Sequence, residues 1–419
     1  MYEGIRYLNS LGQFDVWPGL ERIQSLLSHL GSPQNDFNSI IVGGTNGKGS
    51  VGTAISSVLV TAGYKTALYT SPHLVRLTER IRINGAEISD GVLNTLLLEI
   101  RENSIRHGIG PSYFEALTAA AFLYFAREGV QWAVLEVGMG GRWDATNVVK
   151  PALSVITNVS LDHMSFLGNS IREIAGEKAG IIKEGVPVVT GAQGEAADVI
   201  REKAESLGSP AVFDGRDFSV TGNTTDDFSY NGAEWSISNL EFGLMGTHQL
   251  ENAAVVMASF ETLSKSVGLG ISEQNVKNGL KSVELEGRFE VLLNKALIIL
   301  DGAHNTAGAR ALVESLRSIY GNKKFVFMIA MNANKEHGAF IERLTAVAER
   351  IIFTELSHEA RASASKLGSV AAEYVQNYET ISEPGEALRT ALSYGKPLCI
   401  TGSLYLIGEI KQLIEKNPV

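Results

Sequence analysis

The sequence predicts an α/β protein built from two domains of unequal size. A chain of 419 residues is longer than one hydrophobic core usually organises. Short β-rich runs alternate with longer helical stretches, which is the pattern of a parallel sheet covered by helices. This alternation occurs in two blocks, so each block is expected to fold around a sheet of its own.

The first block predicts the larger domain, residues 1–286. Apolar, β-rich runs bounded by turn residues predict its strands, and longer stretches between them predict its helices. The expected strands are 39–43, 65–70, 132–137, 153–157 and 186–190, and the expected helices are 50–62, 90–106, 113–127, 170–182, 248–262 and 272–281. The short, polar, turn-rich segments of 211–243 predict antiparallel hairpins added to this sheet domain.

The second block predicts a smaller, Rossmann-like α/β domain, residues 287–419. Its expected strands are 296–300, 325–330, 350–354 and 397–401, and its expected helices are 306–318, 336–347, 363–376, 384–393 and 403–415. The turn around Glu286–Gly287–Arg288 is the expected linker. A ligand cleft between two such domains is typical.

The composition is that of an ordinary soluble globular protein, with 44% hydrophobic and 20% charged residues. The longest nearly apolar stretch, 116–126, is too short to span a bilayer, and the N-terminus lacks the pattern of a signal peptide. The single cysteine, Cys399, fits a reducing compartment, so a cytoplasmic protein without a membrane partner is expected. The net charge of −10 argues against a general nucleic-acid binder but leaves room for a locally positive cleft.

A glycine-rich stretch, GGTNGKGSVG at residues 43–52, follows the apolar run 40–42. Its glycines at 47, 49 and 52 match the dinucleotide-binding pattern G-x-G-x-x-G, which would indicate a redox enzyme. Lys48 after Gly47, with Ser50 close behind, instead resembles a P-loop for a nucleoside triphosphate. The match to G-x-x-x-x-G-K-[ST] is imperfect, because Val42 replaces the first glycine and Gly49 separates Lys48 from Ser50.

The P-loop interpretation is favoured because the dinucleotide pattern lacks its acidic partner. That partner stands about 20 residues after the glycines, where it binds the ribose hydroxyls. No Asp or Glu lies between Gly52 and Glu79. A strand, a loop of backbone N–H groups, a lysine and a hydroxyl at a helix start are the parts of a phosphate site. We therefore predict a P-loop ATPase-like first domain whose nucleotide-binding residues include Thr45, Asn46, Gly47, Lys48, Gly49 and Ser50.

Further motifs agree with this loop in order and spacing. They are GTNGKGS at 44–50, TSPHLVRLTERIRING at 70–85, YFEALTAAAF at 113–122, LEVGMGGRWDATN at 135–147, LDHMSFLG at 161–168, IAGEKAGIIK at 174–183, GTHQLENA at 246–253, GRFE at 287–290, LDGAHN at 300–305 and TGSLYLIGE at 401–409. Together they resemble the folylpolyglutamate synthase and dihydrofolate synthase family, a branch of the Mur ligase superfamily. The stretches SPHLVRLTERIRING and GGRWDATN are most similar to the bifunctional bacterial type.

Position along the predicted strands favours Glu136 as a metal residue but leaves His163 open. Glu136 ends the apolar run WAVLE, and carboxylates at the ends of strands in α/β sheets often meet ligands. His163 follows another predicted strand, although a single histidine is more often structural or exposed. The resemblance implies two Mg²⁺ ions, with Ser71, Glu136, His163, Ser50 and a carbamylated Lys178 as the metal-binding residues. It thereby makes Lys48, Glu136, His163 and Lys178 the expected catalytic residues.

The remaining site residues also follow from the resemblance. It places Asn252, Arg288 and Asp301 near ATP, associates His304 and Ser403 with glutamate, and places Arg82, Phe114 and Asp144 at the pterin. From the residues alone, a linker salt bridge is a competing but less favoured interpretation of Arg288, and an ordinary core position suits Phe114 at least as well. For Lys178 the alternative is a solvated helix lysine.

The predicted reaction is ATP-dependent addition of L-glutamate to dihydropteroate or to the glutamate tail of a reduced folate, through an acyl phosphate. The expected partners are these small molecules, and the expected oligomeric state is a monomer. The alternatives are another Mur-type amide ligase with a different acid, and a nucleotide-binding protein without catalysis. A peptidoglycan Mur ligase is disfavoured because only about 40 residues precede the loop, fewer than a typical domain of about 100 residues.

Overall fold

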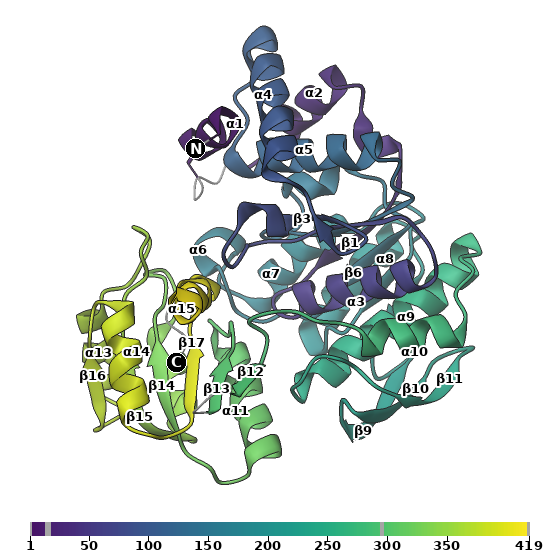
Figure 1. Cartoon of the computed structure of the whole chain (residues 1–419). Helices are drawn as coiled ribbons and strands as arrows, with labels where there is room; N and C mark the ends of the chain where they lie inside the picture. The colour runs from purple at the N-terminus through teal and green to yellow at the C-terminus, as the bar shows by residue number, and fades with distance from the viewer. Residues whose placement is uncertain (1, 13–17, 294–296, 417–419) are drawn as a thin grey trace.

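The computed structural model describes residues 2–12, 18–293 and 297–416, and it contains two α/β units, each around its own sheet (Figure 1). The first sheet has eight strands in the order β4-β3-β2-β5-β1-β6-β7-β8. Six of them run parallel: β1 (Asn38–Gly43), β2 (Thr66–Tyr69), β5 (Trp132–Glu136), β6 (Leu153–Ile156), β7 (Val188–Thr190) and β8 (Ala211–Phe213). At one edge β3 (Ile81–Ile83) and β4 (Ala86–Glu87) pair antiparallel, so the sheet is mixed rather than wholly parallel.

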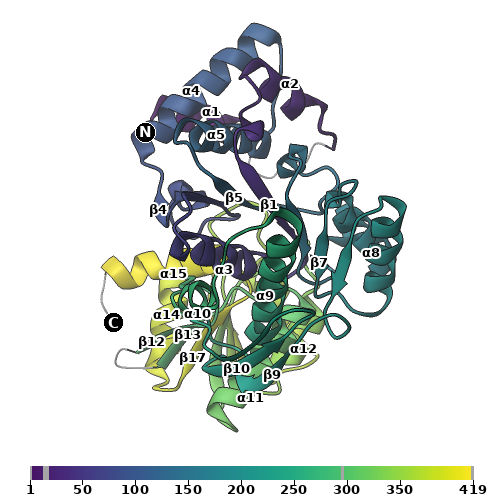
Figure 2. The ribbon, with the colours of Figure 1, turned by 90° about the vertical axis from the view of Figure 1, so that its right-hand side faces the viewer.

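Helices cover both faces of this sheet (Figure 2). One face carries α3 (Lys48–Thr61), α9 (His248–Val267) and α10 (Glu273–Lys281); the other carries α1 (Glu3–Ser10), α2 (Glu21–His29), α4 (Asp90–His107), α5 (Tyr113–Arg127), α7 (Ile171–Lys178) and α8 (Gly194–Ser206). Alternation along β1 explains this layering. Ile40 and Val42 belong to the core under α3 and α9, whereas Ile41 faces the core under α7 and α8.

The polar interval 211–243 divides between two sheets. Its first strand, β8, adds to the edge of the main sheet in parallel, so the prediction of a hairpin there was wrong. The rest forms a separate antiparallel sheet of β9 (Ser219–Thr224), β10 (Asp227–Asn231) and β11 (Ser236–Leu240), as expected. Phe228 and Tyr230 of β10 bury their rings in the core under α9, which attaches this sheet to the first unit.

The second sheet has the order β12-β13-β17-β14-β15-β16. Its strands are β12 (Glu290–Leu293), β13 (Leu297–Leu300), β14 (Phe325–Ile329), β15 (Ala348–Phe353), β16 (Tyr378–Thr380) and β17 (Leu398–Thr401). All pair in parallel except β12, which is antiparallel to β13. The predicted strand 296–300 is observed from Leu297, and residue 296 lies outside the described residues.

Helices cover both faces of the second sheet as well. The core on one face includes residues of α11 (Thr306–Tyr320), α12 (His337–Leu344) and α13 (Ala364–Ala371); the core on the other includes residues of α14 (Pro384–Ser393) and α15 (Leu404–Lys416). Five short helices lie in loops: η1 (Pro33–Asn35), η2 (Leu77–Arg80), η3 (Ala145–Val148), α6 (Met164–Leu167) and η4 (Ala179–Ile181). The exact boundary near residue 286 stays a prediction.

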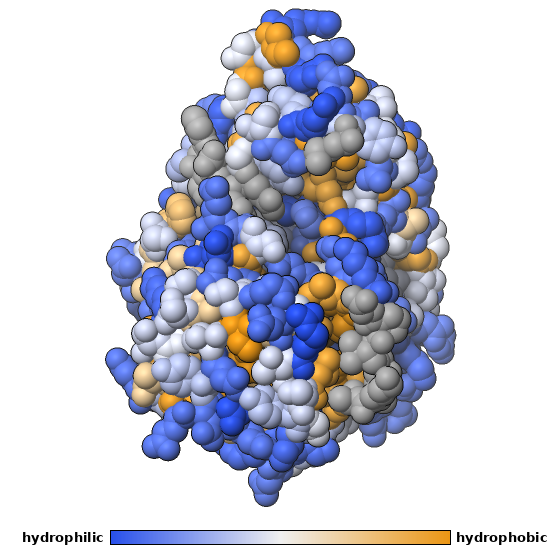
Figure 3. Space-filling view, turned by 60° about the vertical axis from the view of Figure 1, so that its left-hand side comes forward, coloured by the Kyte–Doolittle hydropathy of each residue, from blue (hydrophilic) through white to orange (hydrophobic). Residues whose placement is uncertain are grey.

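The surface and the helices agree with the composition. The face in Figure 3 is mostly hydrophilic, and its apolar residues gather in separate patches. Among the described residues, no helix is both long enough and apolar enough to cross a bilayer. The carboxyl ends of β1, β2, β5 and β6 meet at one edge of the first sheet, where ligands bind in α/β folds.

Candidate active site

The glycine-rich loop joins β1 to α3, as a phosphate-binding loop requires. Gly47 adopts φ +81°, a left-handed conformation, and the helix begins at the next residue. The Lys48 amine turns back over the loop and donates to the carbonyl oxygens of Gly44 at 3.2 Å and Thr45 at 3.1 Å. A cation and a free helix N-terminus therefore face the same space.

The first turn of helix α9 packs against this loop. The Gln249 amide donates to the Ser50 hydroxyl at 3.4 Å, and Asn252 donates to Gln249 at 2.8 Å. A Cβ at Gly47 would lie 2.3 Å from Asn252 Oδ1, so only glycine allows this approach. The predicted nucleotide residue Asn252 thus lies against the loop.

Glu136 lies at the end of β5, beside the start of α3. Its Oε2 accepts the backbone N–H of Ser71 at 3.1 Å, and a Cβ at Gly49 would lie 3.8 Å from the same oxygen. Burial raises the pKa of this carboxyl, while Lys48, the Ser71 N–H and Arg288 counteract the shift. Two predicted metal ligands, Ser71 and Glu136, are therefore neighbours in space.

Arg288 lies between the two units. A Cβ on Gly49 of the first unit would lie 3.9 Å from its Nη2, and a Cβ on Gly302 of the second would lie 2.3 Å from its Nη1. Burial lowers its pKa, against the opposing effect of Asp301 and Glu136. No salt bridge to Arg288 is found within the residues that the structure covers, so the linker salt bridge is wrong.

Lys178 is buried at the end of α7, so the alternative of a solvated helix lysine is wrong. Its amine donates to the Gly44 carbonyl oxygen at 2.7 Å, the same oxygen that Lys48 contacts. Burial and the nearby charge of Lys48 lower its pKa to about 7. A large share of this amine is therefore neutral at physiological pH.

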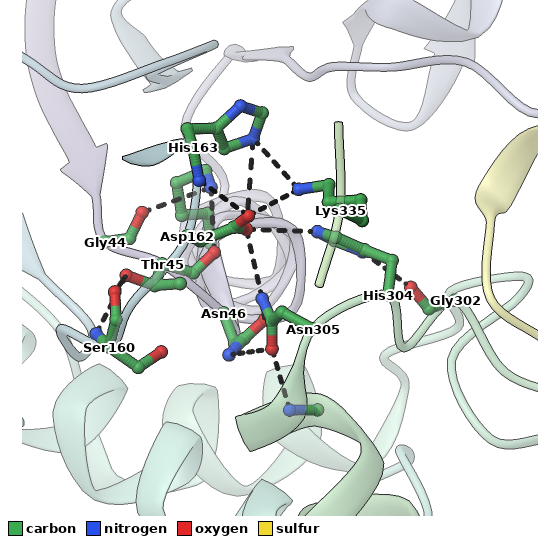
Figure 4. Close-up of polar contacts among 12 residues, drawn as sticks. Gly44, Thr45, Asn46, Ser160, Asp162, His163, Gly302, His304, Asn305 and Lys335 are labelled. Carbon is green, nitrogen blue, oxygen red and sulfur yellow. Dashed lines mark hydrogen bonds and ion pairs between the residues drawn. The ribbon is translucent and has the colours of Figure 1, made fainter. Parts of the chain in front are cut away.

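The turn after β6 brings Asp162 and His163 against the second unit (Figure 4). Asp162 accepts from Lys335 Nζ at 2.5 Å and from Asn305 Nδ2 at 3.1 Å, and its Oδ2 lies 3.4 Å from His304 Nε2. Burial alone would raise the pKa of Asp162, but His304 and Lys335 hold it well below its usual range. One carboxylate thus joins three side chains of the second unit.

His163 stands next to that carboxylate in a left-handed conformation, φ 50°. Its Nε2 lies 3.4 Å from Lys335 Nζ. Burial and the charge of Lys335 lower the pKa of the imidazole to about 3. The ring is therefore neutral, as a metal-binding histidine must be.

A second contact links the P-loop directly to the second unit. The side-chain amides of Asn46 and Asn305 exchange hydrogen bonds of 3.3 and 3.0 Å. Asn305 also caps α11 by accepting the Gly308 N–H at 2.8 Å. The N-terminus of α11 is thereby held against the loop.

The other second-unit candidates lie nearby. Asp301 accepts the backbone N–H groups of Phe289 and Ala303, both at 3.0 Å. Ser403 is buried at the start of α15, and its neighbour Gly402 donates to Ala303 at 2.9 Å. Asp301, His304 and Ser403 therefore belong to adjoining turns.

The structure brings together two of the three predicted pterin residues. A Cβ at Gly138 would lie 2.9 Å from the Phe114 ring and 3.2 Å from Asp144 Oδ2, so both side chains meet at this glycine. Asp144 also caps η3 by accepting the Thr146 N–H at 3.0 Å, and burial raises its pKa. Arg82 instead lies 3.6 Å from Glu87 of β4.

Sequence reasoning missed several residues of this site. Asp162 directly precedes His163 in the loop after the predicted strand 153–157, so the position that drew attention to His163 also applied to Asp162. Gln249 lies inside the motif GTHQLENA. Lys335 had no sequence signal, because it lies in the loop after β14 and meets Asp162 only through the packing of the two units.

Over the ranges 2–12, 18–293 and 297–416, no group of three or more His, Cys, Asp and Glu side chains forms a ready metal site. A metal site at Glu136 would therefore depend on hydroxyl groups, such as those of Ser50 and Ser71, and on ligand oxygens. Residues 42–260 match the Mur ligase middle domain, and residues 287–404 match the Mur ligase glutamate ligase domain.

Relatives match along nearly the whole chain. It is 37% identical to a dihydrofolate synthase/folylpolyglutamate synthase of Bacillus subtilis, covering 96% of both chains. It is also 37% identical to a folylpolyglutamate synthase of Thermotoga maritima, whose crystal structure matches with a TM-score of 0.85 over 100% of this chain and 97% of that one. The Escherichia coli protein solved with DHPP and ADP matches with a TM-score of 0.91 at 29% identity, over 99% and 98% of the two chains. The chain therefore belongs to the folylpolyglutamate synthase and dihydrofolate synthase family, the branch of the Mur ligases that the motifs indicated, and is an enzyme of the ligase class.

Proposed function

We propose that this chain is an ATP-dependent ligase that adds L-glutamate to dihydropteroate and to the glutamate tail of a reduced folate. The observation that carries the proposal is the convergence of the P-loop, Glu136 and the Asp162–His163 turn with the second unit at one sheet edge. The E. coli relative, solved with DHPP and ADP, supports a nucleotide and a pterin as ligands. Both activities are proposed because the B. subtilis relative, whose name carries both, is as similar as the T. maritima protein, whose name carries one.

The loop residues would bind the phosphates of ATP. The backbone N–H groups of residues 47–50, at the N-terminus of α3, offer donors for phosphate oxygens, whereas those of Thr45 and Asn46 already donate to Asn158. Lys48 adds a cation. Arg288 lies where it can reach a phosphate from the junction of the two units, and Asn252 and Asp301 complete the proposed nucleotide contacts. The site would therefore bind ATP fully only when both units are in place.

The donor set suits two Mg²⁺ ions. Glu136, with Ser50 and Ser71, would hold one; His163, with a carbamylated Lys178, would hold the other. A neutral Lys178 amine can form a bond to CO₂ and release a proton. The product is a carbamate, whose oxygens can bind a metal ion where the lysine amine cannot. When bound, the ions would neutralise charge on the transferring phosphoryl group. Carboxylate, carbamate and phosphate oxygens would provide most of the binding, because Mg²⁺ prefers oxygen ligands.

The reaction would proceed in two steps. A carboxylate oxygen of the acid attacks the γ-phosphorus of ATP, the bond to ADP breaks, and an acyl phosphate forms. The amine of glutamate then attacks the carbonyl carbon, and phosphate leaves as the amide forms. Lys48 and the loop amides would stabilise the charge on the phosphoryl group. Phe114 and Asp144 would bind the pterin, with Arg82 at the edge of that site, and His304 and Ser403 would orient the glutamate.

Phosphate release by the purified protein tests this function. With ATP and glutamate, the proposal expects release with dihydropteroate and also with tetrahydrofolate. Turnover with tetrahydrofolate alone would overturn the double activity, and turnover with neither would point to a different acid. Glu136→Gln should reduce the rate by ~100-fold or more without changing the circular dichroism. Glu128→Gln, at an exposed glutamate in the same region of the chain, should leave the rate unchanged.

A further inference from the structure

Arg80 is a buried cation that forms no salt bridge with any acidic side chain of the described residues. Only 4% of its surface is exposed, and its Nε donates to His73 Nδ1 at 2.9 Å. No hydrogen bond or ion pair to its two terminal nitrogens is found in the described part of the chain. Arginine is almost never buried without a partner, because removing its charge from water is costly.

The acidic residues closest to it in the sequence have other partners. Glu79 accepts three backbone N–H groups, those of residues 74, 75 and 76, at 2.7 to 3.0 Å. Glu87 pairs with Arg76 and lies 3.6 Å from Arg82. The unpaired charge of Arg80 is thus not a consequence of a local shortage of carboxylates.

The guanidinium is also held in one place. His73 accepts its Nε hydrogen, and the Arg80 guanidinium carbon lies 6.0 Å from the centroid of the Tyr113 ring. With Nε occupied, the two terminal nitrogens remain for a bidentate contact with a planar anion.

The surroundings of Arg80 indicate which planar anion its two terminal nitrogens would bind. Its carbonyl oxygen accepts the Thr70 N–H at 3.0 Å, and the next residue, Ser71, donates to Glu136. On the other side, Tyr113 directly precedes Phe114 of the proposed pterin site. Arg80 therefore lies beside the Tyr113 ring and against the segment that leads to Ser71, so it neighbours segments that carry both proposed metal-binding and proposed pterin-binding residues.

We propose that Arg80 binds the reacting carboxylate of the acid substrate and positions it for attack on ATP. The inference rests on the proposed function and adds to it a specific contact to the acid. His73 is then a positioning residue that fixes the guanidinium. Any carboxylate could satisfy this cation, including that of the incoming glutamate, but the neighbourhood of Tyr113 and Phe114 favours the pterin-bearing acid.

Steady-state kinetics of Arg80→Gln and Arg80→Lys provide the first test. With the acid that the wild type turns over, KM for that acid should rise ~30-fold or more in Arg80→Gln. Arg80→Lys should recover part of the loss, and KM for glutamate should stay within about twofold. Arg76→Gln, an exposed arginine of the same segment, serves as the matched control and should behave like the wild type.

Three outcomes would overturn the proposal. An increase in KM for glutamate alone would assign Arg80 to the other substrate. A fall in kcat with both KM values unchanged would mean that Arg80 acts only on Glu136. Unchanged kcat and KM in Arg80→Gln would show that the charge of Arg80 contributes to the binding of neither substrate.

Binding of pteroate and of an analogue lacking the carboxyl group provides the second test, in which no turnover is needed. In the wild type, calorimetry should show weaker binding of the analogue; in Arg80→Gln the two ligands should bind almost equally. If the substitution weakens both ligands by the same factor, Arg80 does not contact the carboxylate and the inference fails. If the wild type binds neither ligand, the proposed function itself fails, so the two failures can be distinguished.

Discussion

Lys178 shows how strongly the fold changes the chemistry of one residue. Its amine is buried, and burial lowers its pKa from the usual 10.5 of a lysine to about 7. The lysine is neutral in the folded chain but charged in the unfolded chain between these two pKa values. The unfolded state then binds more protons, so the penalty for burying Lys178 is complete below about pH 7 and fades as the pH rises toward 10.5.

Substitution of this lysine should therefore stabilise the protein in a pH-dependent way. In CO₂-free buffer, Lys178→Met should raise Tm at pH 6 to 7, and the difference from the wild type should shrink as the pH approaches 10.5. Phosphate release should be lost at every pH. Lys150→Met removes an exposed lysine and should change Tm little. A Tm difference independent of pH would contradict the assignment of a lowered pKa.

Three of the candidate residues predicted from the sequence share one property. Lys48 and His163 follow strands of the first sheet and Glu136 ends one, and parallel strands present their carboxyl ends at one edge. Arg80 and Lys335 carry no such signal. Lys335 reaches Asp162 across 173 positions of sequence, and only the packing of the two units makes that contact.

At the scale of elements, the loop between β1 and α3 depends on the conformation of Gly47. Comparing two glycines of this region separates the cost of a left-handed conformation from the effect of the close contact with Asn252. Gly47 has φ +81°, and a Cβ there would lie 2.3 Å from Asn252; Gly63, past the end of α3, has φ +89° and nothing within 4 Å of its Cβ position. A left-handed conformation costs an L-residue ~1–2 kcal/mol. Both Gly47→Ala and Gly63→Ala should lose this much stability, and only Gly47→Ala should also disturb the loop.

Gly47→Ala should therefore lose more than stability. Its ATP affinity, measured by calorimetry, should fall ~10-fold or more, because Asn252 and the loop must move apart. Gly63→Ala should unfold at slightly lower denaturant concentration and bind ATP like the wild type. Equal ATP affinity in the two variants would show that the contact between Gly47 and Asn252 does not shape the loop.

Elements were predictable from the sequence where hydrophobic periodicity was strong. The central strands β1, β5 and β6 are buried at nearly every position and were predicted within a few residues. Helices α1 and α2 were missed because they are short and no side chain caps their first turns. Strands β4 and β16 were missed because they have two and three residues and are only partly buried.

At the scale of the whole molecule, the two units meet through a compact group of polar side chains. Asp162 of the first unit contacts Lys335, His304 and Asn305 of the second, and Asn305 also contacts Asn46 of the P-loop (Figure 4). The carboxylate and the lysine amine are 7% and 8% exposed, so water screens this ion pair little. The position of the second unit is thereby linked directly to the nucleotide loop and to the His163 turn.

Lys335→Met should loosen this junction. Removing Lys335 takes one cation from the buried Asp162 carboxylate, which keeps only His304 and Asn305 as partners from the second unit, and this costs ~3 kcal/mol. The chain can avoid this cost by separating the two units, so hydrogen exchange should increase together at the P-loop and at the start of α11 while both cores stay protected. Lys396→Met is the matched control, because it removes an exposed pair with Glu349 inside the second unit and should cost ~0–1 kcal/mol without changing exchange at the junction. Uniform acceleration over the whole chain in Lys335→Met would mean that the ion pair stabilises the fold as a whole and does not specifically hold the two units together.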